Sequence, residues 1–399
     1  MGPAAREQIA KLQASKIRLV ANAAMGRDDV LPFWFGESDQ PTPDFITEAA
    51  VTALRAHRSF YTHTMGSPWL RESISAYLRR LHGRAFDPAA IAVTSAGVSA
   101  LMVAMQAILD PGDHVVAVTP VWPNLLEIPK ILSAEITEVA LRPTQQGWRL
   151  DVDELFAAVT ARTRLLLVNS PSNPTGWVLD AASRDAILTH CRALGIWVIG
   201  DDVYERLVFD PALPSAPSFL AAAQAGDRVI SVNSFSKAWR MTGWRLGWIA
   251  APVELAGELA KLLEFNTSCA PEFVQAGAKV ALDEGEAEVA RLRAGLVSAR
   301  NRLIGALQDM PGVQTVTPDG GMYAFFRIEG ASDSVALCRQ LIDEAGLGLA
   351  PGGAFGEAGE GWLRWCFAAR PARLEDGIAR LSRWMQARQG SRAARLARP

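Results

Sequence analysis

The chain has 399 residues, with 40 Lys and Arg side chains against 42 Asp and Glu side chains, so its net charge is −2 when histidine is neutral. This near balance argues against a dedicated nucleic-acid binder and against a protein that docks on anionic membranes. Hydrophobic residues make up 49% of the sequence, as in soluble globular proteins, and no uncharged apolar run approaches the roughly 18 residues of a membrane-spanning helix.

Short apolar runs rich in Val, Ile and Leu alternate with helical patterns along the first two thirds of the chain. The predicted strands cover residues 91–94, 115–118, 165–168, 197–199 and 229–232. Apolar positions three or four residues apart predict helices at 98–109, 151–159 and 180–194, the last ended by Gly195. Apolar strands of this kind are covered on both faces, so we expect an α/β fold with a mostly parallel central sheet sandwiched by helices.

The pattern changes after about residue 270. Longer helical patterns follow, including one at about 286–308, together with a short strand-like segment at 321–326. This part of the chain is predicted to form a smaller α+β domain.

Several classes of site and location can be set aside at this point. Residues 1–7 contain no apolar run of the signal-peptide type, so we expect a cytoplasmic location. No His-Glu-x-x-His or Cys-x-x-Cys motif is present, so we expect no metal. The cysteines are too widely spaced to suggest a disulfide framework; they are Cys191, Cys269, Cys338 and Cys366.

The most informative segment, residues 234–247, directly follows the last predicted strand of the sheet. Burial of Lys237 there would be costly and would lower its pKa, which is what an amine nucleophile requires. Ser234 and Ser236 supply hydroxyl groups, and Arg245 supplies a guanidinium that can hold a phosphate. The segment therefore predicts a reactive lysine beside a phosphate site.

This segment resembles the Ser-x-Ser-Lys and Arg-x-Gly motif of the fold-type I pyridoxal-phosphate (PLP) enzymes, specifically the class I/II aminotransferases of the aspartate aminotransferase family. Further motifs in the right order extend the resemblance over nearly the whole chain. It implies the PLP-dependent transferase fold type I, a Schiff base between PLP and Lys237, and phosphate contacts from Ser234, Ser236 and Arg245.

Two further segments follow predicted strands and resemble family motifs. Residues 200–205 resemble Asp-Glu-x-Tyr, which implies that Asp201 pairs with the pyridine nitrogen of PLP and that Tyr204 binds its 3-oxygen. Taken alone, Asp201 could equally be a helix N-cap and Tyr204 a core aromatic residue. Residues 169–176 resemble Asn-Pro-x-Asn-Pro-Thr-Gly, so Asn173 would share the 3-oxygen and lie beside the substrate, in a segment that is also a turn former.

Residues 94–101 run from a strand into a helix, so the amide groups of Gly97 and Val98 can meet phosphate at the helix N-terminus. Trp122 matches the family position whose ring stacks on the cofactor. The alternative for Trp122 is an ordinary core residue, since the chain contains twelve tryptophans.

Two positions resemble the substrate-binding residues of the family. Arg364 lies in an apolar strand-like run and matches the arginine that grips the substrate α-carboxylate; an internal salt bridge is the alternative. Residues 35–41 resemble Gly-Glu-Pro-Asp, in which Gly36 lets the substrate approach the backbone, although Ser38 replaces the usual proline.

Tyr61 matches a family residue that reaches the phosphate of the neighbouring subunit, which implies a homodimer with shared active sites. On this basis we expect three parts. Residues 1–45 form an N-terminal segment that packs with the small domain and the dimer partner, residues 46–270 form the large PLP-binding domain, and residues 271–399 form the small C-terminal domain.

The implied activity is transfer of an amino group between an L-amino acid and a 2-oxo acid by a ping-pong mechanism through the Lys237 Schiff base. The same motifs do not fix which bond at the substrate α-carbon breaks, so a PLP-dependent carbon–sulfur β-lyase or related elimination enzyme is the alternative. A regulatory protein that only binds the cofactor and a catalytically silent relative are further alternatives.

The identity of the amino donor is left more open. One dicarboxylate-specific branch of the family has a lysine at the position of Val98. The acidic side chain of a substrate such as aspartate would therefore lack that lysine as a partner in this chain. Trp34, Trp122 and Trp244 could shape an apolar pocket. The sequence thus slightly favours an aromatic or aliphatic donor over aspartate.

Overall fold

The computed structural model describes residues 5–396, with side chains described as far as residue 389; the first four residues of the N-terminal stretch considered above lie outside this range. Its largest sheet has seven strands, in which β10 runs antiparallel to both of its neighbours and the other neighbours run parallel. Across the sheet the order is β2 (Ile91–Thr94), β10 (Gly247–Ala250), β9 (Val229–Ser234), β8 (Trp197–Asp201), β7 (Thr163–Asn169), β3 (His114–Thr119) and β4 (Glu135–Ala140). The predicted α/β class with a mostly parallel sheet is confirmed.

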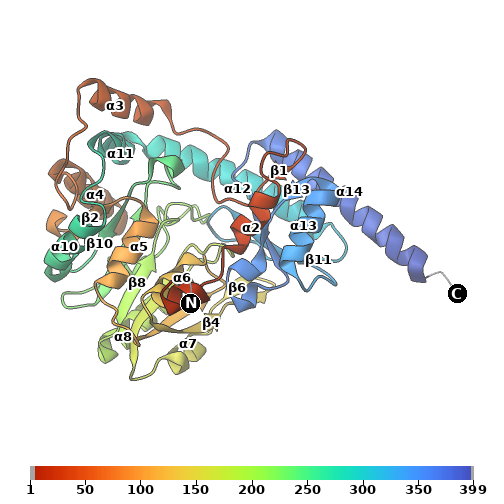
Figure 1. Ribbon diagram of the computed structural model, residues 1–399, viewed down its shortest axis with the longest axis horizontal. Coiled ribbons are helices and arrows are strands. Elements are labelled where there is room, and N and C mark those ends of the chain that lie inside the picture. Colours follow the sequence, from red (N-terminus) through yellow and green to blue (C-terminus); the bar gives the residue numbers. More distant parts are fainter. Residues whose placement is uncertain (1–4, 397–399) are drawn as a thin grey trace.

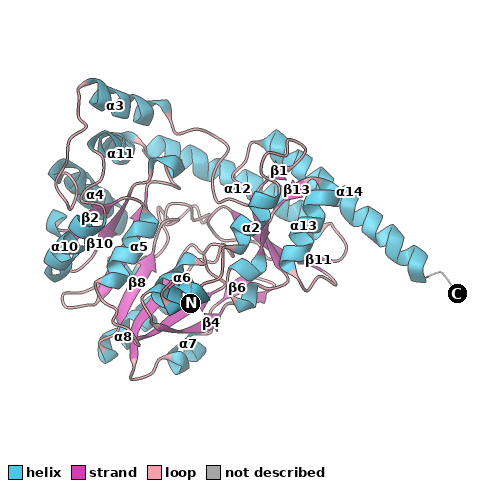
Figure 2. Cartoon of the chain, in the orientation of Figure 1, coloured by secondary structure: helices cyan, strands magenta, loops and turns pink. Residues whose placement is uncertain are grey.

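Helices cover both faces of this sheet (Figures 1 and 2). Side chains alternate between the faces, so Leu165 and Leu167 of β7 join one core cluster while Leu166 and Val168 join another. One face is covered by α5 (Gly97–Gln106), α6 (Asn124–Ile131) and α10 (Ala256–Asn266). The other is covered by α7 (Val152–Ala158), α8 (Ala181–Leu194), α9 (Phe219–Ala222), α4 (Pro68–His82) and α11 (Glu272–Glu284).

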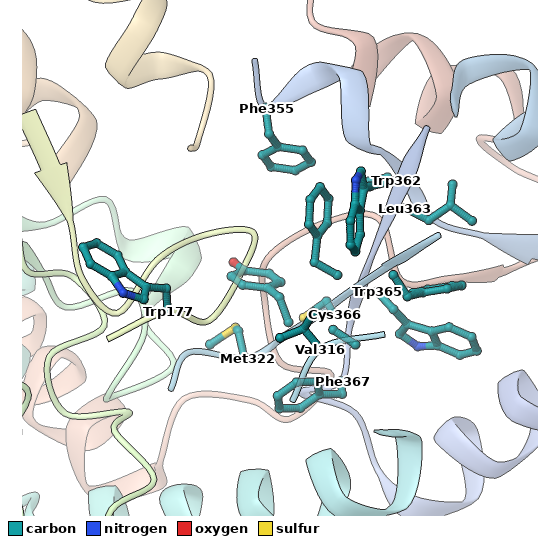
Figure 3. Packing of buried hydrophobic residues seen from close by; sticks show 14 of the residues in the cluster. Trp177, Val316, Met322, Phe355, Trp362, Leu363, Trp365, Cys366 and Phe367 are labelled. Carbon is teal, nitrogen blue, oxygen red and sulfur yellow. The ribbon is translucent and has the colours of Figure 1, made fainter. Parts of the chain in front are cut away.

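A second, antiparallel sheet lies in the C-terminal part of the chain, as the pattern after residue 270 predicts. Its strands are β11 (Val313–Thr315), β12 (Tyr323–Ile328), β15 (Trp362–Cys366) and β14 (Ala350–Pro351). Aromatic side chains, among them Phe355, Trp362 and Trp365, fill its core (Figure 3). The rings of Phe325 and Trp362 stack with centroids 5.2 Å apart. The adjoining helices are α12 (Glu286–Gln308), α13 (Ser334–Ala345) and α14 (Pro371–Leu396).

The N-terminal segment packs against this second part of the molecule. α2 (Lys16–Ala23) contacts α13 and β14, and β1 (Leu31–Pro32) pairs in parallel with β13 (Leu347–Gly348) (Figure 1). α1 (Glu7–Lys11) lies against α6, and β5 (Arg142–Thr144) forms a small hairpin with β6 (Gly147–Arg149).

The division of the chain at residues 45 and 270 stays a prediction. α11 packs on α3 (Asp44–Arg55) and α4, so Val274 and Ala278 share a core with Ile46 and Leu70. This packing favours a second boundary further along the chain, within α12. No helix between residues 5 and 396 is long and apolar enough to cross a membrane.

Candidate active site

Polar residues that follow the strands of the large sheet gather around one cavity of about 780 Å³. They meet there because the carboxyl ends of parallel strands lie at the same edge of a sheet. The predicted residues that line the cavity are Gly36, Gly97, Val98, Trp122, Asn173, Asp201, Tyr204, Ser234, Ser236, Lys237, Arg245 and Arg364. Tyr61 is 91% exposed and does not line it.

Lys237 follows β9 and points its amine into the cavity. Its Nζ donates a hydrogen bond of 2.6 Å to the main-chain oxygen of Gly36. Burial lowers the pKa of Lys237 to about 8, and the guanidinium groups of Arg364 and Arg245 act in the same direction. A substantial fraction of this amine is therefore neutral and nucleophilic at slightly alkaline pH.

Asp201 is the last residue of β8 and is only 2% exposed. Burial, assisted by the neighbouring carboxyl of Asp202, raises the pKa of Asp201 to about 7. No cationic side chain forms an ion pair with it in the described part of the chain. Because an ionised carboxylate is costly to bury without a partner, this group is suited to a cationic N–H on a bound ligand.

Asn169, the last residue of β7, connects two of these groups. Its Nδ2 donates to the main-chain oxygen of Asp201 over 2.9 Å, and its Oδ1 accepts from the main-chain N–H of Asn173 over 2.8 Å. The end of β8 and the loop that carries Asn173 are thereby held together.

Tyr204 meets a residue that the sequence analysis did not select. The hydroxyl groups of Tyr204 and Tyr323 lie 2.6 Å apart, and Tyr323 comes from β12 in the second sheet. A Cβ at position 36 would lie 2.0 Å from the Tyr323 hydroxyl, so only glycine fits there. Tyr323 is one of only four tyrosines in the chain, and it places a polar group in a largely apolar strand. This feature of the sequence could have marked it as a candidate site residue.

The residues predicted to hold phosphate lie together at one side of the site. Ser234 donates to the Ser236 hydroxyl over 2.9 Å, and Gly97 begins α5 close to Ser234. Arg245 has a left-handed φ of +53° and an exposed guanidinium that donates to the main-chain oxygen of Thr242. Hydroxyl groups, a guanidinium and a helix N-terminus form a suitable anion site.

Arg364 is 2% exposed and projects from β15. Its guanidinium donates to Asn173 Oδ1 over 2.9 Å and to the main-chain oxygen of Trp34, while its Nε has no hydrogen-bond partner. No carboxylate pairs with Arg364 among the described residues, so the internal salt bridge considered as the alternative is not found there. A buried guanidinium of this kind is suited to an incoming carboxylate.

Comparison with known proteins identifies the family of the chain. Residues 28–381 match the model of the family Aminotransferase class I and II. The chain is 33% identical over 368 residues to the probable aspartate/prephenate aminotransferase of Aquifex aeolicus, covering 90% of this chain and 91% of the relative. It is 33% identical over 366 residues to the arginine–pyruvate transaminase of Pseudomonas aeruginosa, covering 92% of each chain. The solved structure of N-succinyldiaminopimelate aminotransferase from Mycobacterium tuberculosis superposes with a TM-score of 0.89 at 30% identity, covering 95% of this chain and 99% of that one.

The fold and the residues around the cavity thus define a transferase of fold type I. The chain belongs to the class I and II aminotransferase family, and it is an enzyme that transfers amino groups. Enzymes of this family use PLP.

Proposed function

We propose that this enzyme binds PLP through Lys237 and uses it to move an amino group from an L-amino acid to a 2-oxo acid in a ping-pong cycle. The observation that carries the proposal is that one cavity holds an amine of lowered pKa, a buried carboxyl without a cation and a buried guanidinium without a carboxylate. When bound, PLP supplies a ring that withdraws electrons from the substrate α-carbon.

The residues present fit this cofactor. Ser234, Ser236, Arg245 and the α5 N-terminus at Gly97 and Val98 would hold its phosphate. Asp201 would accept a hydrogen bond from the ring nitrogen and keep that nitrogen protonated, which also relieves the cost of burying the carboxyl.

The remaining cofactor contacts would come from the loops around the ring. Tyr204 and Asn173 would bind the 3-oxygen, and the half-buried Trp122 would lie against the ring face. Asn169 would support both Asp201 and Asn173 through its two hydrogen bonds.

The substrate would be oriented by Arg364, which offers a charged fork to the α-carboxylate in a buried setting. Gly36 would line the substrate position, since its main chain borders the same cavity and its missing side chain makes room for the Tyr323 hydroxyl. Lys237, once displaced by the substrate amine, would take the proton from the α-carbon, because a pKa of about 8 lets it act as a base near neutral pH.

The homodimer belongs to the same proposal. Tyr61 and its neighbour Phe60 are 91% and 78% exposed, and Tyr61 lies away from this chain's own cavity. That position leaves Tyr61 free to reach the phosphate site of a second copy. Sedimentation of the purified enzyme tests the dimer, and loss of cofactor affinity in Tyr61→Ala tests the shared site. The cytoplasmic location stays a prediction.

The activity is tested with a panel of amino donors supplied with 2-oxoglutarate or pyruvate, scoring formation of the matching oxo acid, with Lys237→Ala as the inactive control. The carbon–sulfur lyase alternative predicts instead that a cysteine conjugate releases pyruvate and ammonia without any acceptor. The named relatives are aminotransferases and transaminases, which favours the first outcome.

A further inference from the structure

The short segment at residues 34–36 contacts the two cations already placed in the site. The main-chain oxygen of Trp34 accepts a hydrogen bond from Arg364, and the main-chain oxygen of Gly36 accepts one from Lys237 over 2.6 Å. These two carbonyl groups therefore help to fix where the Arg364 guanidinium and the Lys237 amine lie relative to each other.

The residue between Trp34 and Gly36 is Phe35, and a third cation, Arg18, stacks on its ring. The guanidinium of Arg18 lies 4.6 Å from the centroid of the Phe35 ring, and both residues line the same cavity. Stacking on an aromatic face holds the planar guanidinium in a preferred orientation. Arg18 comes from the first turn of α2, which is anchored beside it by the buried side chain of Ile17.

The charge of Arg18 is not compensated by the protein. Its side chain is exposed, and no ion pair or hydrogen bond of its guanidinium occurs among the described residues. The nearby acid of the cavity, Glu37, instead accepts a hydrogen bond from Thr242. Arg18 is therefore available to a ligand.

Apart from Glu37, the other charged groups of the cavity already have roles in the proposed function. Lys237, Arg245 and Asp201 would be engaged by the cofactor, and Arg364 by the substrate α-carboxylate. One cation remains at the cavity wall. Its natural complement is a second anionic group on the substrate, at the end away from the α-carbon.

We propose that Arg18 binds the distal carboxylate of dicarboxylic amino acids and 2-oxo acids, so that acidic substrates are preferred over aliphatic or aromatic ones. This inference rests on the proposed function, because it takes Arg364 as the partner of the α-carboxylate. It runs against the slight preference for apolar donors drawn from Val98, since the distal anion is met from the N-terminal helix instead.

The binding test uses the holoenzyme and two unreactive acids of equal length, glutarate with two carboxylates and pentanoate with one. Titration calorimetry is run on the parent, on Arg18→Gln and on Arg339→Gln, a control at an exposed arginine of α13 outside the cavity. Arg18→Gln should lower the affinity for glutarate about tenfold and leave the affinity for pentanoate unchanged. Arg339→Gln should bind both acids as the parent does. Equal affinity for glutarate in all three proteins would overturn the inference.

The kinetic test compares glutamate and aspartate with leucine and phenylalanine as donors. In Arg18→Gln the value of kcat/KM should fall about tenfold for the two acidic donors, mainly through KM, and stay within about twofold for the others. Arg18→Glu should further disfavour acidic donors and improve use of arginine. A uniform loss across all donors would contradict the inference, while failure of the parent enzyme to react with any amino acid would instead overturn the proposed function.

Discussion

The hydroxyl groups of Tyr204 and Tyr323 lie 2.6 Å apart and join the loop after β8 of the large sheet to β12 of the smaller one. Both side chains are buried, and their rings meet edge to face at 5.7 Å. Burial raises the pKa of both phenols, so both stay protonated at physiological pH. One phenol donates to the other, and the pair couples the two sheets at the active site.

The contribution of this tyrosine pair to stability can be measured by a double-mutant cycle in the protein before PLP is added. Tyr204→Phe or Tyr323→Phe leaves one buried hydroxyl without its partner, which costs about 1 kcal/mol and lowers Tm by roughly a degree or two. The double variant leaves no such hydroxyl. It should therefore melt no lower than either single variant, and strictly additive losses in thermal denaturation would contradict the pairing.

Arg364 is expected to act on every amino donor alike, because it would bind the α-carboxylate that all of them share. Arg364→Gln should lower kcat/KM at least about 100-fold for acidic, aliphatic and aromatic donors. Arg364→Lys keeps the positive charge but loses the two parallel N–H donors of the guanidinium, so its kcat/KM should fall less. Steady-state kinetics over a donor panel checks this, and selective loss for one donor would count against the assignment.

The raised pKa of Asp201 predicts how the stability of the protein without PLP changes with pH. In the protein without PLP, the folded state keeps a proton that the unfolded chain releases between about pH 4 and pH 7. The contribution of this carboxyl to stability therefore falls as pH rises through that window. Asp201→Asn removes the titration, so without PLP the variant should melt above the parent at pH 7 and higher, and close to it near pH 4. A Tm difference that does not change with pH would contradict this.

The lowered pKa of Lys237 predicts how fast the cofactor attaches. The neutral amine is the attacking form, and its fraction rises as pH rises through about 8. Stopped-flow absorbance should show the attachment rate rising with a midpoint near pH 8, about two and a half pH units below that of a free model lysine. A midpoint above pH 10 would show that burial does not activate this amine.

Much of the fold could be predicted because its strands are continuous apolar runs. The five predicted strands at residues 91–232 and the helix at 286–308 all occur, and Gly195 ends α8 with a φ of +66°. β4 and β10 were missed for different reasons. β4 is an edge strand with exposed glutamates and lacks the apolar run that marks a doubly covered strand. β10 is apolar and buried, but it begins at Gly247, the last residue of the segment that was interpreted as a site motif.

Residues that directly follow a strand, such as Asp201 and Lys237, could be predicted to lie at the cavity. The presence of Tyr323 and Arg18 there could not, because it depends on how the second sheet and the N-terminal helix pack against the cavity. That packing is a tertiary relationship with no local sequence pattern. The resemblance to a known family placed Arg364, but the absence of a carboxylate beside it in the described chain became visible only in three dimensions.

The most direct test of the account is the position of the covalent cofactor link. The purified enzyme is saturated with PLP, reduced with borohydride, digested and analysed by mass spectrometry, with Lys237→Ala treated in parallel. The account predicts a phosphopyridoxyl group on the peptide that contains Lys237 and none in the variant. A label on another lysine of the parent enzyme, or no label at all, would contradict it.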